Sequence, residues 1–321
     1  MRWIVALGIV IASCFVVKAY SPHHEGANVF ETLYYHLIPA PLVKPAAAPG
    51  AGEHGEHGEP EPLLEIPLPA ALAFLDYRGH MPAGEGPKTV LFNLQVFQVA
   101  AILLGIWCFL GVPRYLRTGR GDQMSRMFAG WAMWIRDEMV YPVMGKKMGR
   151  RFLPYFLCVF FFIMFMNVMG LVPFSVTATA SIFVTGALAL TTLVAILACG
   201  MIAQGPIAFW KNLVPHVPLV LWPLMFFVEV LGLLVKPFAL MIRLFANMNG
   251  GHMVVLSFMG LIFYLARPEM WGVAGGWGAV PIGIGFAVFI MIIEAFVALL
   301  QAYIFTQLSI IFVNASIHPE H

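Results

Sequence analysis

Long apolar segments are the feature that most restricts how this chain can fold. The clearest ones cover residues 153–173, 182–204, 217–265 and 281–312, and about 20 apolar residues in a helix suffice to cross a bilayer. Only 11% of the 321 residues are charged, whereas a soluble domain carries about 25%. Such a chain cannot cover itself with polar surface, so its main solvent is lipid and soluble enzymes are excluded.

These apolar segments predict an all-α membrane protein. Backbone polar groups in lipid must be paired within the protein, and a helical bundle does this without an open sheet edge. We expect a bundle of about five transmembrane helices, one at about 89–112 and four in the segments above. The last two segments are longer than one perpendicular crossing needs, so we expect them to be tilted, with Pro237 and Gly250-Gly251 as candidate bend points.

The distribution of charge gives an orientation. Nine of the 18 Lys and Arg residues lie in 113–152, opposed there only by Asp122, Asp137 and Glu138. The positive-inside rule places this loop in the cytoplasm. Apolar residues recur within it at helical spacing, namely Met124, Met127, Phe128, Trp131, Ile135 and Met139. This pattern predicts an amphipathic helix on the cytoplasmic membrane surface.

The N-terminal segment 1–19 resembles a targeting or anchoring element. It has Arg2, an apolar run to Val17 and a Val17-x-Ala19 pattern, which are typical of a secretory signal peptide. A retained anchor helix stays open as an alternative, and so does a lipoprotein, because residues 11–14 resemble a lipobox that ends at Cys14. All three interpretations place the chain from residue 20 onward outside the cytoplasm.

The following segment, 20–88, is rich in Pro, Gly, Ala and His and reads as a solvated low-complexity region. We do not expect a metal site at His54 and His57, since no surrounding structure is evident that would fix the ligands. The four cysteines lie in apolar runs without paired metal-ligand spacing, so we interpret them as small packing residues. We therefore predict no metal and no cofactor.

Ionisable and amide side chains interrupt the last two apolar segments. The 217–265 segment contains Glu229, Lys236, Arg243, Asn247 and His252, and the 281–312 segment contains Glu294 and Gln301. An ionisable residue at lipid depth costs about 2.5–3.5 kcal/mol even on the lenient insertion scale. Each has an ordinary explanation when taken alone, such as snorkelling for Lys or a packing hydrogen bond for His. Together, in two neighbouring helices, they indicate an ion pathway.

Spacing places several of these residues on common helix faces. Glu229, Lys236 and Arg243 are seven residues apart and form one stripe. Asn247 follows Arg243 by four residues on the same face, and Glu294 and Gln301 are again seven apart. A guanidinium keeps its proton in proteins, so Arg243 can hold a fixed charge but cannot relay protons. Such a charge needs an anionic partner, which another chain could supply.

The residues around Arg243 resemble a known family. The run from Leu234 to Met248, LVKPFALMIRLFANM, is similar to the signature of F-type ATP synthase subunit a. Supporting similarity lies in Asn167–Pro173, in Pro215-His216 and Pro218 leading to Glu229, and in Glu294–Gln301 followed by AYIF. The resemblance covers about residues 90–316 and so defines a transmembrane domain at 89–316, followed by a cytoplasmic tail at 317–321.

The resemblance implies a role for each matching residue. Arg243 matches the stator arginine that faces a ring of c subunits, and Glu229 matches an acidic position toward the cytoplasmic half-channel. Asn247, His252, Glu294 and Gln301 match positions that line the outer half-channel. Many bacterial members have the acid at the His252 position and the imidazole at the Glu294 position. Here the two are exchanged, as in the mitochondrial subunit.

The implied protein is a proton-translocating stator subunit that couples proton-motive force to ring rotation and ATP synthesis. It is not catalytic by itself. Its partners would be the c ring, the b-subunit stalk, the remainder of the complex, membrane lipid and protons, with no nucleic acid. Its location would be the inner (plasma) membrane, as a multi-pass protein.

Two other classes of membrane protein fit the sequence less well. A stand-alone secondary transporter with a charged site at mid-membrane would predict internal repeats, and none is evident between the two halves of the sequence. A quinone-binding respiratory subunit would call for His pairs or a cofactor motif, and neither is seen.

Overall fold

The computed structural model describes residues 2–21, 40–43, 63–67, 88–172, 177–214, 218, 221–267 and 272–318. Within these residues the fold is helical, except for a short antiparallel pair of strands, β1 (Glu65–Pro67) and β2 (Lys88–Val90). Six helical stretches are long and apolar enough to cross a membrane, and one of them lies near the N-terminus. The prediction of an all-α membrane protein is confirmed.

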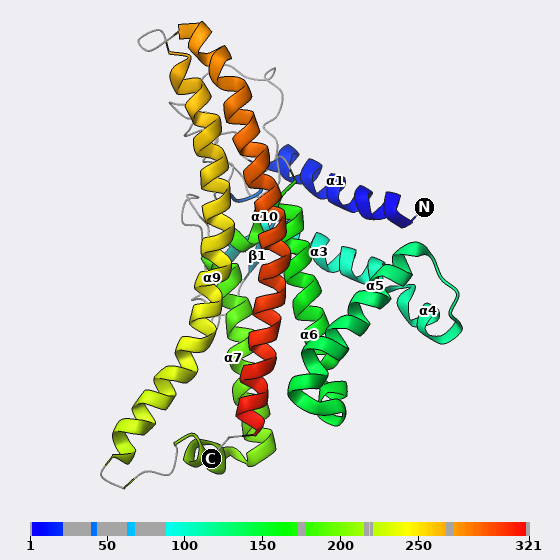
Figure 1. Ribbon diagram of the computed structural model, residues 1–321, viewed down its shortest axis with the longest axis vertical. Coiled ribbons are helices and arrows are strands. Elements are labelled where there is room, and N and C mark those ends of the chain that lie inside the picture. The colour runs from blue at the N-terminus through cyan, green and yellow to red at the C-terminus, as the bar shows by residue number, and fades with distance from the viewer. Residues whose placement is uncertain are drawn as a thin grey trace.

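The helices follow the order of the predicted spans (Figure 1). They are α1 (Arg2–Tyr20), α3 (Asn93–Phe109), α4 (Val112–Thr118), α5 (Gln123–Trp134), a π-helix (Ile135–Val140), α6 (Tyr141–Gly170), a 3-10 turn (Ala178–Ala180), α7 (Ile182–Gln204), α8 (Pro206–Asn212), α9 (Trp222–Leu265) and α10 (Gly272–Ile317). The predicted span 182–204 coincides with α7. The prediction for 153–173 was too short, because α6 begins at Tyr141 and changes direction at Gly145, whose φ is 71°.

The amphipathic segment of the basic loop is helical, as its spacing predicts. Its apolar stripe packs against the protein: Met124, Phe128 and Ile135 are buried. Phe128 lies with its ring centroid 5.7 Å from that of Phe161 in α6. The stripe therefore holds α5 and the π-helix against the membrane helices, and its place at the membrane surface stays a prediction.

The last two helices form a long antiparallel pair that runs the length of the molecule (Figure 1). With 44 residues, α9 is about 66 Å long, which is about twice the hydrocarbon thickness of ~30 Å. A helix this long fits the bilayer only with a strong tilt. In Figure 1, α1 lies to one side of α9 and α10, with its axis at a steep angle to theirs. If α1 spans the bilayer, the long pair therefore lies well away from the membrane normal.

The two candidate bend points do not interrupt α9, which stays helical through Pro237 and Gly250-Gly251. The helix curves along its length without a break (Figure 1), and the two positions stay candidate bend points. Close packing against α10 supports this part of α9. A Cβ added at Gly283 of α10 would lie 2.7 Å from the side chain of Ile262, and the rings of Phe258 and Phe286 stack at 5.0 Å.

Small and polar residues join α6 and α7 to α10. Asn167 Nδ2 donates to the Ala298 carbonyl at 3.2 Å, and Gln204 Nε2 donates to the Ser316 carbonyl at 2.7 Å. A Cβ at Gly200 would approach that same carbonyl to 3.1 Å. Helix packing in lipid relies on such close approaches and interhelical hydrogen bonds, because apolar burial gives little driving force there.

Arg2 fixes the N-terminal helix to the rest of the fold. Its guanidinium donates to Ser125 Oγ at 2.7 Å and to the Trp107 carbonyl at 2.5 Å, and Trp107 Nε1 donates back to the Arg2 carbonyl at 3.1 Å. Asp122 lies 3.7 Å from the same guanidinium. A Cβ at Gly111 would lie 2.1 Å from Ser125 Oγ and 2.3 Å from Arg2 Nη1, so this glycine lets the hydrogen-bonded pair lie against the backbone. The N-terminal end of α1 thus lies beside the basic loop.

The opposite end of α1 meets extended chain from the predicted exterior segment. The Val43 N–H donates to the Tyr20 carbonyl, and the Leu42 N–H donates to the Leu91 carbonyl, both at 2.8 Å. Parts of the predicted low-complexity region therefore have regular backbone pairing. His54 and His57 lie outside the described residues, and no cluster of metal-ligating side chains occurs among the residues that are described.

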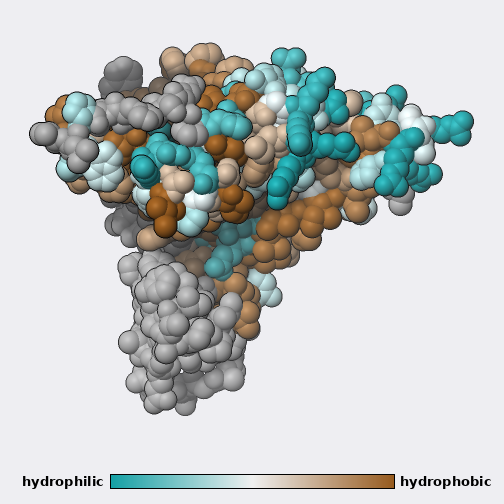
Figure 2. Space-filling model, turned by 90° about the horizontal axis from the view of Figure 1, so that it is seen from below, coloured by the Kyte–Doolittle hydropathy of each residue, from teal (hydrophilic) through white to brown (hydrophobic). Residues whose placement is uncertain are grey.

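Viewed from the end of the molecule that carries α8 and the C-terminus, hydrophilic residues gather along one side of a largely hydrophobic surface (Figure 2). At the start of α6, Lys146, Lys147, Arg150 and Arg151 are all exposed. This pattern agrees with a protein whose basic loops face water while its helices face lipid.

We expect Arg2→Met to lower the stability of the detergent-solubilised protein by about 1–3 kcal/mol, because it leaves buried hydrogen-bonding groups without their partner. The exposed Arg117 provides a matched control, and Arg117→Met should have little effect. Thermal unfolding of the two variants measures the difference. Equal midpoints would show that the Arg2 contacts do not hold α1 in place.

Candidate functional site

The polar residues predicted from the last two apolar segments meet at the interface of α9 and α10. Asn247 Nδ2 on α9 donates to Gln301 Oε1 on α10 at 3.0 Å. Further along the pair, His252 Nδ1 and Glu294 Oε1 form an ion pair. Both α10 residues are buried: Glu294 is 5% exposed and Gln301 is 1% exposed. Four of the six predicted site residues are thus brought together, two by two, on facing helices.

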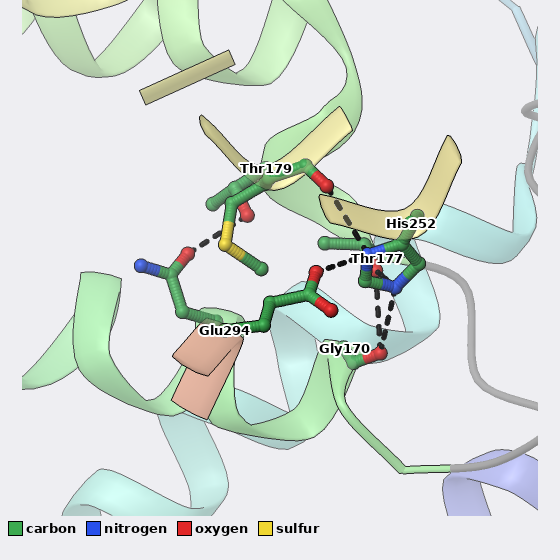
Figure 3. A network of polar contacts seen from close by, with 7 residues as sticks. Gly170, Thr177, Thr179, His252 and Glu294 are labelled. Carbon is green, nitrogen blue, oxygen red and sulfur yellow. Dashed lines mark hydrogen bonds and ion pairs between the residues drawn. The ribbon is translucent and has the colours of Figure 1, made fainter. Parts of the chain in front are cut away.

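The His252 side chain sits in a ring of oxygen atoms supplied by three elements (Figure 3). Its Nε2 lies 2.7 Å from Thr177 Oγ1 and 3.2 Å from the Gly170 carbonyl at the end of α6. Its Nδ1 lies 3.1 Å from the Met248 carbonyl, one turn back on α9. Together with Glu294, these residues form what we call the His252 cluster: Gly170, Thr177, Met248, His252 and Glu294.

A neighbouring glycine makes room for the acid of this cluster. A Cβ added at Gly251 would lie 2.8 Å from the Cδ and Oε1 atoms of Glu294, so the Glu294 carboxyl rests directly against the α9 backbone. Gly250 has nothing within 4 Å of its added Cβ. Gly251 therefore leaves room for the Glu294 carboxyl, whereas Gly250 faces open space.

Two further buried residues brace the His252 cluster. Thr179 Oγ1 donates to Asn167 Oδ1 at 2.8 Å, and Asn167 in turn donates to a carbonyl of α10, the helix that carries Glu294. In the sequence, Asn167 stands out only as part of the family motif, and Thr177 and Thr179 lie in the short segment between the predicted spans 153–173 and 182–204. Their only signal in the sequence is that hydroxyl residues directly follow a membrane span. Their burial is visible only in the structure.

Arg243 lies on α9 between the two ends of the site. It is partly exposed, yet its Nη1 atom is buried and has no hydrogen-bond partner among the described residues. Across this same part of the chain, no carboxylate lies within 4 Å of it. Gln301 Nε2 is a second buried donor without a partner there. Both atoms are donors, so the group they could receive is an acceptor such as a carboxylate.

The other two ionisable residues of α9 line a separate cavity. Glu229 and Lys236 face a cavity of about 220 Å³ between α7, α8, α9 and the end of α10, together with Gln204, Ser316 and His318. The Lys236 Nζ atom lies 5.6 Å from the centre of the Phe312 ring. Fourteen residues separate Glu229 from Arg243, which is about 21 Å along a helix. The seven-residue stripe therefore exists, but it does not join these side chains into one contact.

Small residues surround Arg243 on the open side of α9. Gly232, Ala239, Ala246 and Gly250 fall within about 60° of Arg243 around the helix axis, at 100° per residue. Ala239, Ala246 and Gly250 are exposed, and an added Cβ at Gly232 or Gly250 would meet nothing within 4 Å. We call these residues, with Arg243, the Arg243 face. Its small side chains would let another helix approach the guanidinium closely.

Comparisons with known proteins agree with the earlier resemblance. The family described as ATP synthase A chain matches residues 94–314. The subunit a of the ATP synthase of Myxococcus xanthus is 39% identical over 300 residues, which cover 94% of this chain and 89% of that protein. The corresponding subunit of Chlorobium phaeobacteroides is 43% identical over 98% of this chain and 93% of its own length. That of Anaeromyxobacter dehalogenans strain 2CP-C is 47% identical, over 57% of this chain and 47% of its own.

We expect Gly251→Ala to destabilise the protein, whereas Gly250→Ala should leave stability unchanged or raise it by up to about 1 kcal/mol, the usual helix preference for Ala over Gly. The reason is that only the first substitution places a methyl group against Glu294. Thermal unfolding of the detergent-solubilised variants compares them directly. A Gly251→Ala protein as stable as Gly250→Ala would mean that the Glu294 carboxyl does not rest on the α9 backbone.

Proposed function

Because the chain belongs to the ATP synthase A chain family, we propose that it provides two proton half-channels, separated by a fixed arginine, to and from a rotating ring of c subunits. As a member of this family it works in the proton-translocating membrane sector, and it is not the catalytic part of the ATP synthase. The half-channels, the stator role of Arg243 and the partners named below are our proposal.

The observation that carries the proposal is the unpartnered guanidinium of Arg243. A charged group at lipid depth costs free energy unless it is paired or hydrated. Glu294 is already occupied by His252, and Glu229 is about 21 Å away along α9. The small residues of the Arg243 face leave the guanidinium open toward a neighbouring helix. A carboxylate on a passing c subunit would supply the missing acceptor.

The His252 cluster suits the outer half-channel. His252 and Glu294 can exchange a proton between their contacting atoms, and the Asn247–Gln301 hydrogen bond lies between this pair and Arg243 along the helices. In the orientation given by the basic loop, this end of α9 leads to the exterior. A proton that enters here would neutralise the carboxylate of a c subunit, which could then rotate into lipid.

The cavity beside Glu229 suits the inner half-channel. It is a polar cavity at the end that carries α8 and the C-terminus, and Glu229 is its carboxylate. After nearly a full turn, the c-subunit carboxylate would reach this side and release its proton, because the nearby positive charge of Arg243 stabilises the ionised form. Arg243 itself keeps its proton, so protons cannot pass straight from one half-channel to the other. A proton-motive force thereby becomes torque.

The alternative of a stand-alone secondary transporter is less well supported. A transporter site that works within one chain would pair its central charge with groups of that chain or with its substrate. In this chain the acid proposed for the outer half-channel, Glu294, is instead paired with His252. We therefore infer a stator that needs the c ring, with the b-subunit stalk holding it and the inner membrane as its location. The basic loop and the C-terminus face the cytoplasm in this arrangement.

We also propose that α1 stays in the mature protein as a membrane helix. The contacts of Arg2 with Trp107 and Ser125 join α1 to both α3 and α5, and Tyr20 is paired to exterior chain. These contacts favour the retained anchor over the cleaved signal peptide that the sequence pattern first indicates. They orient α1 with its basic end toward the cytoplasm, in agreement with the positive-inside rule.

We expect Arg243→Ala to abolish proton-driven ATP synthesis while the complex still assembles, because the c-subunit carboxylate loses its fixed counter-charge. Arg243→Lys should fail as well, since lysine lacks the planar fork and can lose its proton when buried. ATP synthesis by inverted membrane vesicles measures both. Arg267→Ala, at an exposed residue beyond the end of α9, is the control and should be active. Normal synthesis in either Arg243 variant would refute the stator role.

The retention of α1 can be read from the intact mass of the protein in the purified complex. We expect a mass that includes residues 2–20. A mass that begins at residue 20, or a lipid-modified chain that begins at Cys14, would contradict this proposal and restore one of the two processing alternatives.

A further inference from the structure

His252 has oxygen atoms facing both of its ring nitrogens, and this arrangement determines where its protons sit (Figure 3). Glu294 and the Met248 carbonyl face Nδ1, whereas Thr177 Oγ1 and the Gly170 carbonyl face Nε2. A neutral imidazole has one N–H donor and one acceptor nitrogen, and an imidazolium has two donors. The neighbours of each nitrogen therefore select among these forms.

The neighbours of Nε2 favour it as a donor. A carbonyl oxygen can only accept, so Gly170 can bond this nitrogen only through an Nε2–H. The Thr177 hydroxyl donates its one hydrogen to the same Gly170 carbonyl at 3.3 Å, which leaves its oxygen as an acceptor for the ring. Gly170 is the last residue of α6, where helix carbonyls lack a partner within the helix. Its carbonyl is thus available for both bonds.

We propose that Thr177 and Gly170 act together as a positioning clamp that holds the hydrogen on His252 Nε2 and so confines the transferable proton to the contact between Nδ1 and Glu294. The inference rests on the proposed function and names the residues that set the direction of proton exchange in the outer half-channel.

With the clamp in place, the proton exchange involves only Nδ1 of His252 and the Glu294 carboxylate. When the Nδ1–H bond of the imidazolium breaks, its proton forms an O–H bond on the Glu294 carboxylate. The products are a neutral imidazole that keeps its Nε2–H and a neutral carboxylic acid. The net charge of the pair is zero before and after the step, so no unpaired charge appears between the helices. Transfer back reverses the same two bonds.

The clamp is built into the fold rather than formed by a free side chain. Thr177 is 1% exposed, and a Cβ at Gly170 would lie 2.7 Å from its side chain, so only glycine admits the threonine at this place. Two residues further on, Thr179 is tied through Asn167 to the Ala298 carbonyl of α10. The same helix, α10, carries Glu294. Thr177 and Glu294 are therefore fixed relative to each other on the two sides of the His252 imidazole.

The test uses the assembled complex in membrane vesicles and compares three variants by proton-driven ATP synthesis and by ATP-driven proton pumping. Thr177→Val keeps the side-chain shape but removes the hydroxyl, and we expect it to lower both rates about tenfold, the cost of one lost hydrogen bond to a charged group. Thr177→Ser keeps the hydroxyl and should restore the rates. Thr185→Val is the matched control, because that buried hydroxyl bonds only to carbonyls at the start of its own helix, and it should be normal.

Thr177→Ala provides a second variant without the hydroxyl and adds no bulk, so it serves if the valine variant does not assemble; it should be as slow. A full rate in either variant would overturn the clamp, and so would a Thr177→Ser protein as slow as Thr177→Val. His252→Gln separates this failure from failure of the proposed function. If His252→Gln is inactive while Thr177→Val is normal, only the clamp is refuted. If His252→Gln is fully active, the outer half-channel itself is refuted.

Discussion

A positive charge that no described residue of its own chain neutralises is the constraint on which the rest of this structure depends. The Arg243 guanidinium cannot shed its proton, and one of its nitrogens is buried without a partner among the described residues. A lipid-embedded protein keeps such a group only when something else completes it. The nearest acids of the chain are engaged elsewhere: Glu294 with His252, and Glu229 at a distant cavity. In our proposal, a carboxylate on a partner that moves past the Arg243 face is the missing acceptor, and the small residues of this face allow its close approach.

In the proposed mechanism, the long antiparallel pair of α9 and α10 makes this charge a barrier between two half-channels. At about 66 Å, α9 exceeds the bilayer thickness and has to lie at a strong tilt. The tilt separates the His252 cluster from the Glu229 cavity along the membrane as well as across it, with Arg243 between them. Glycines at the contacts allow the two helices to lie close, as Gly251 does against Glu294 and Gly283 does against Ile262.

The sequence predicted the helices better than it predicted their ends and contacts. The span of α7 and the polar positions of α9 followed from apolar length and seven-residue spacing. The start of α10 was missed, because the glycine-rich run 272–280 looks like a loop, although in the fold Gly276 packs against Ala266 and extends the helix. Thr177 could not be assigned, since its contact with His252 joins residues 75 positions apart. Such a contact depends on how α6 ends, which spacing along one segment does not encode.

The most direct test of the central claim is a structure of the whole complex in its membrane environment, with the distance measured from the Arg243 guanidinium to the nearest carboxylate. The account predicts that this carboxylate belongs to a c subunit packed against the Arg243 face, within reach of a charge-assisted hydrogen bond or one bridging water in at least one rotary position. An Arg243 paired with an acid of its own chain, or turned toward lipid headgroups, would contradict it.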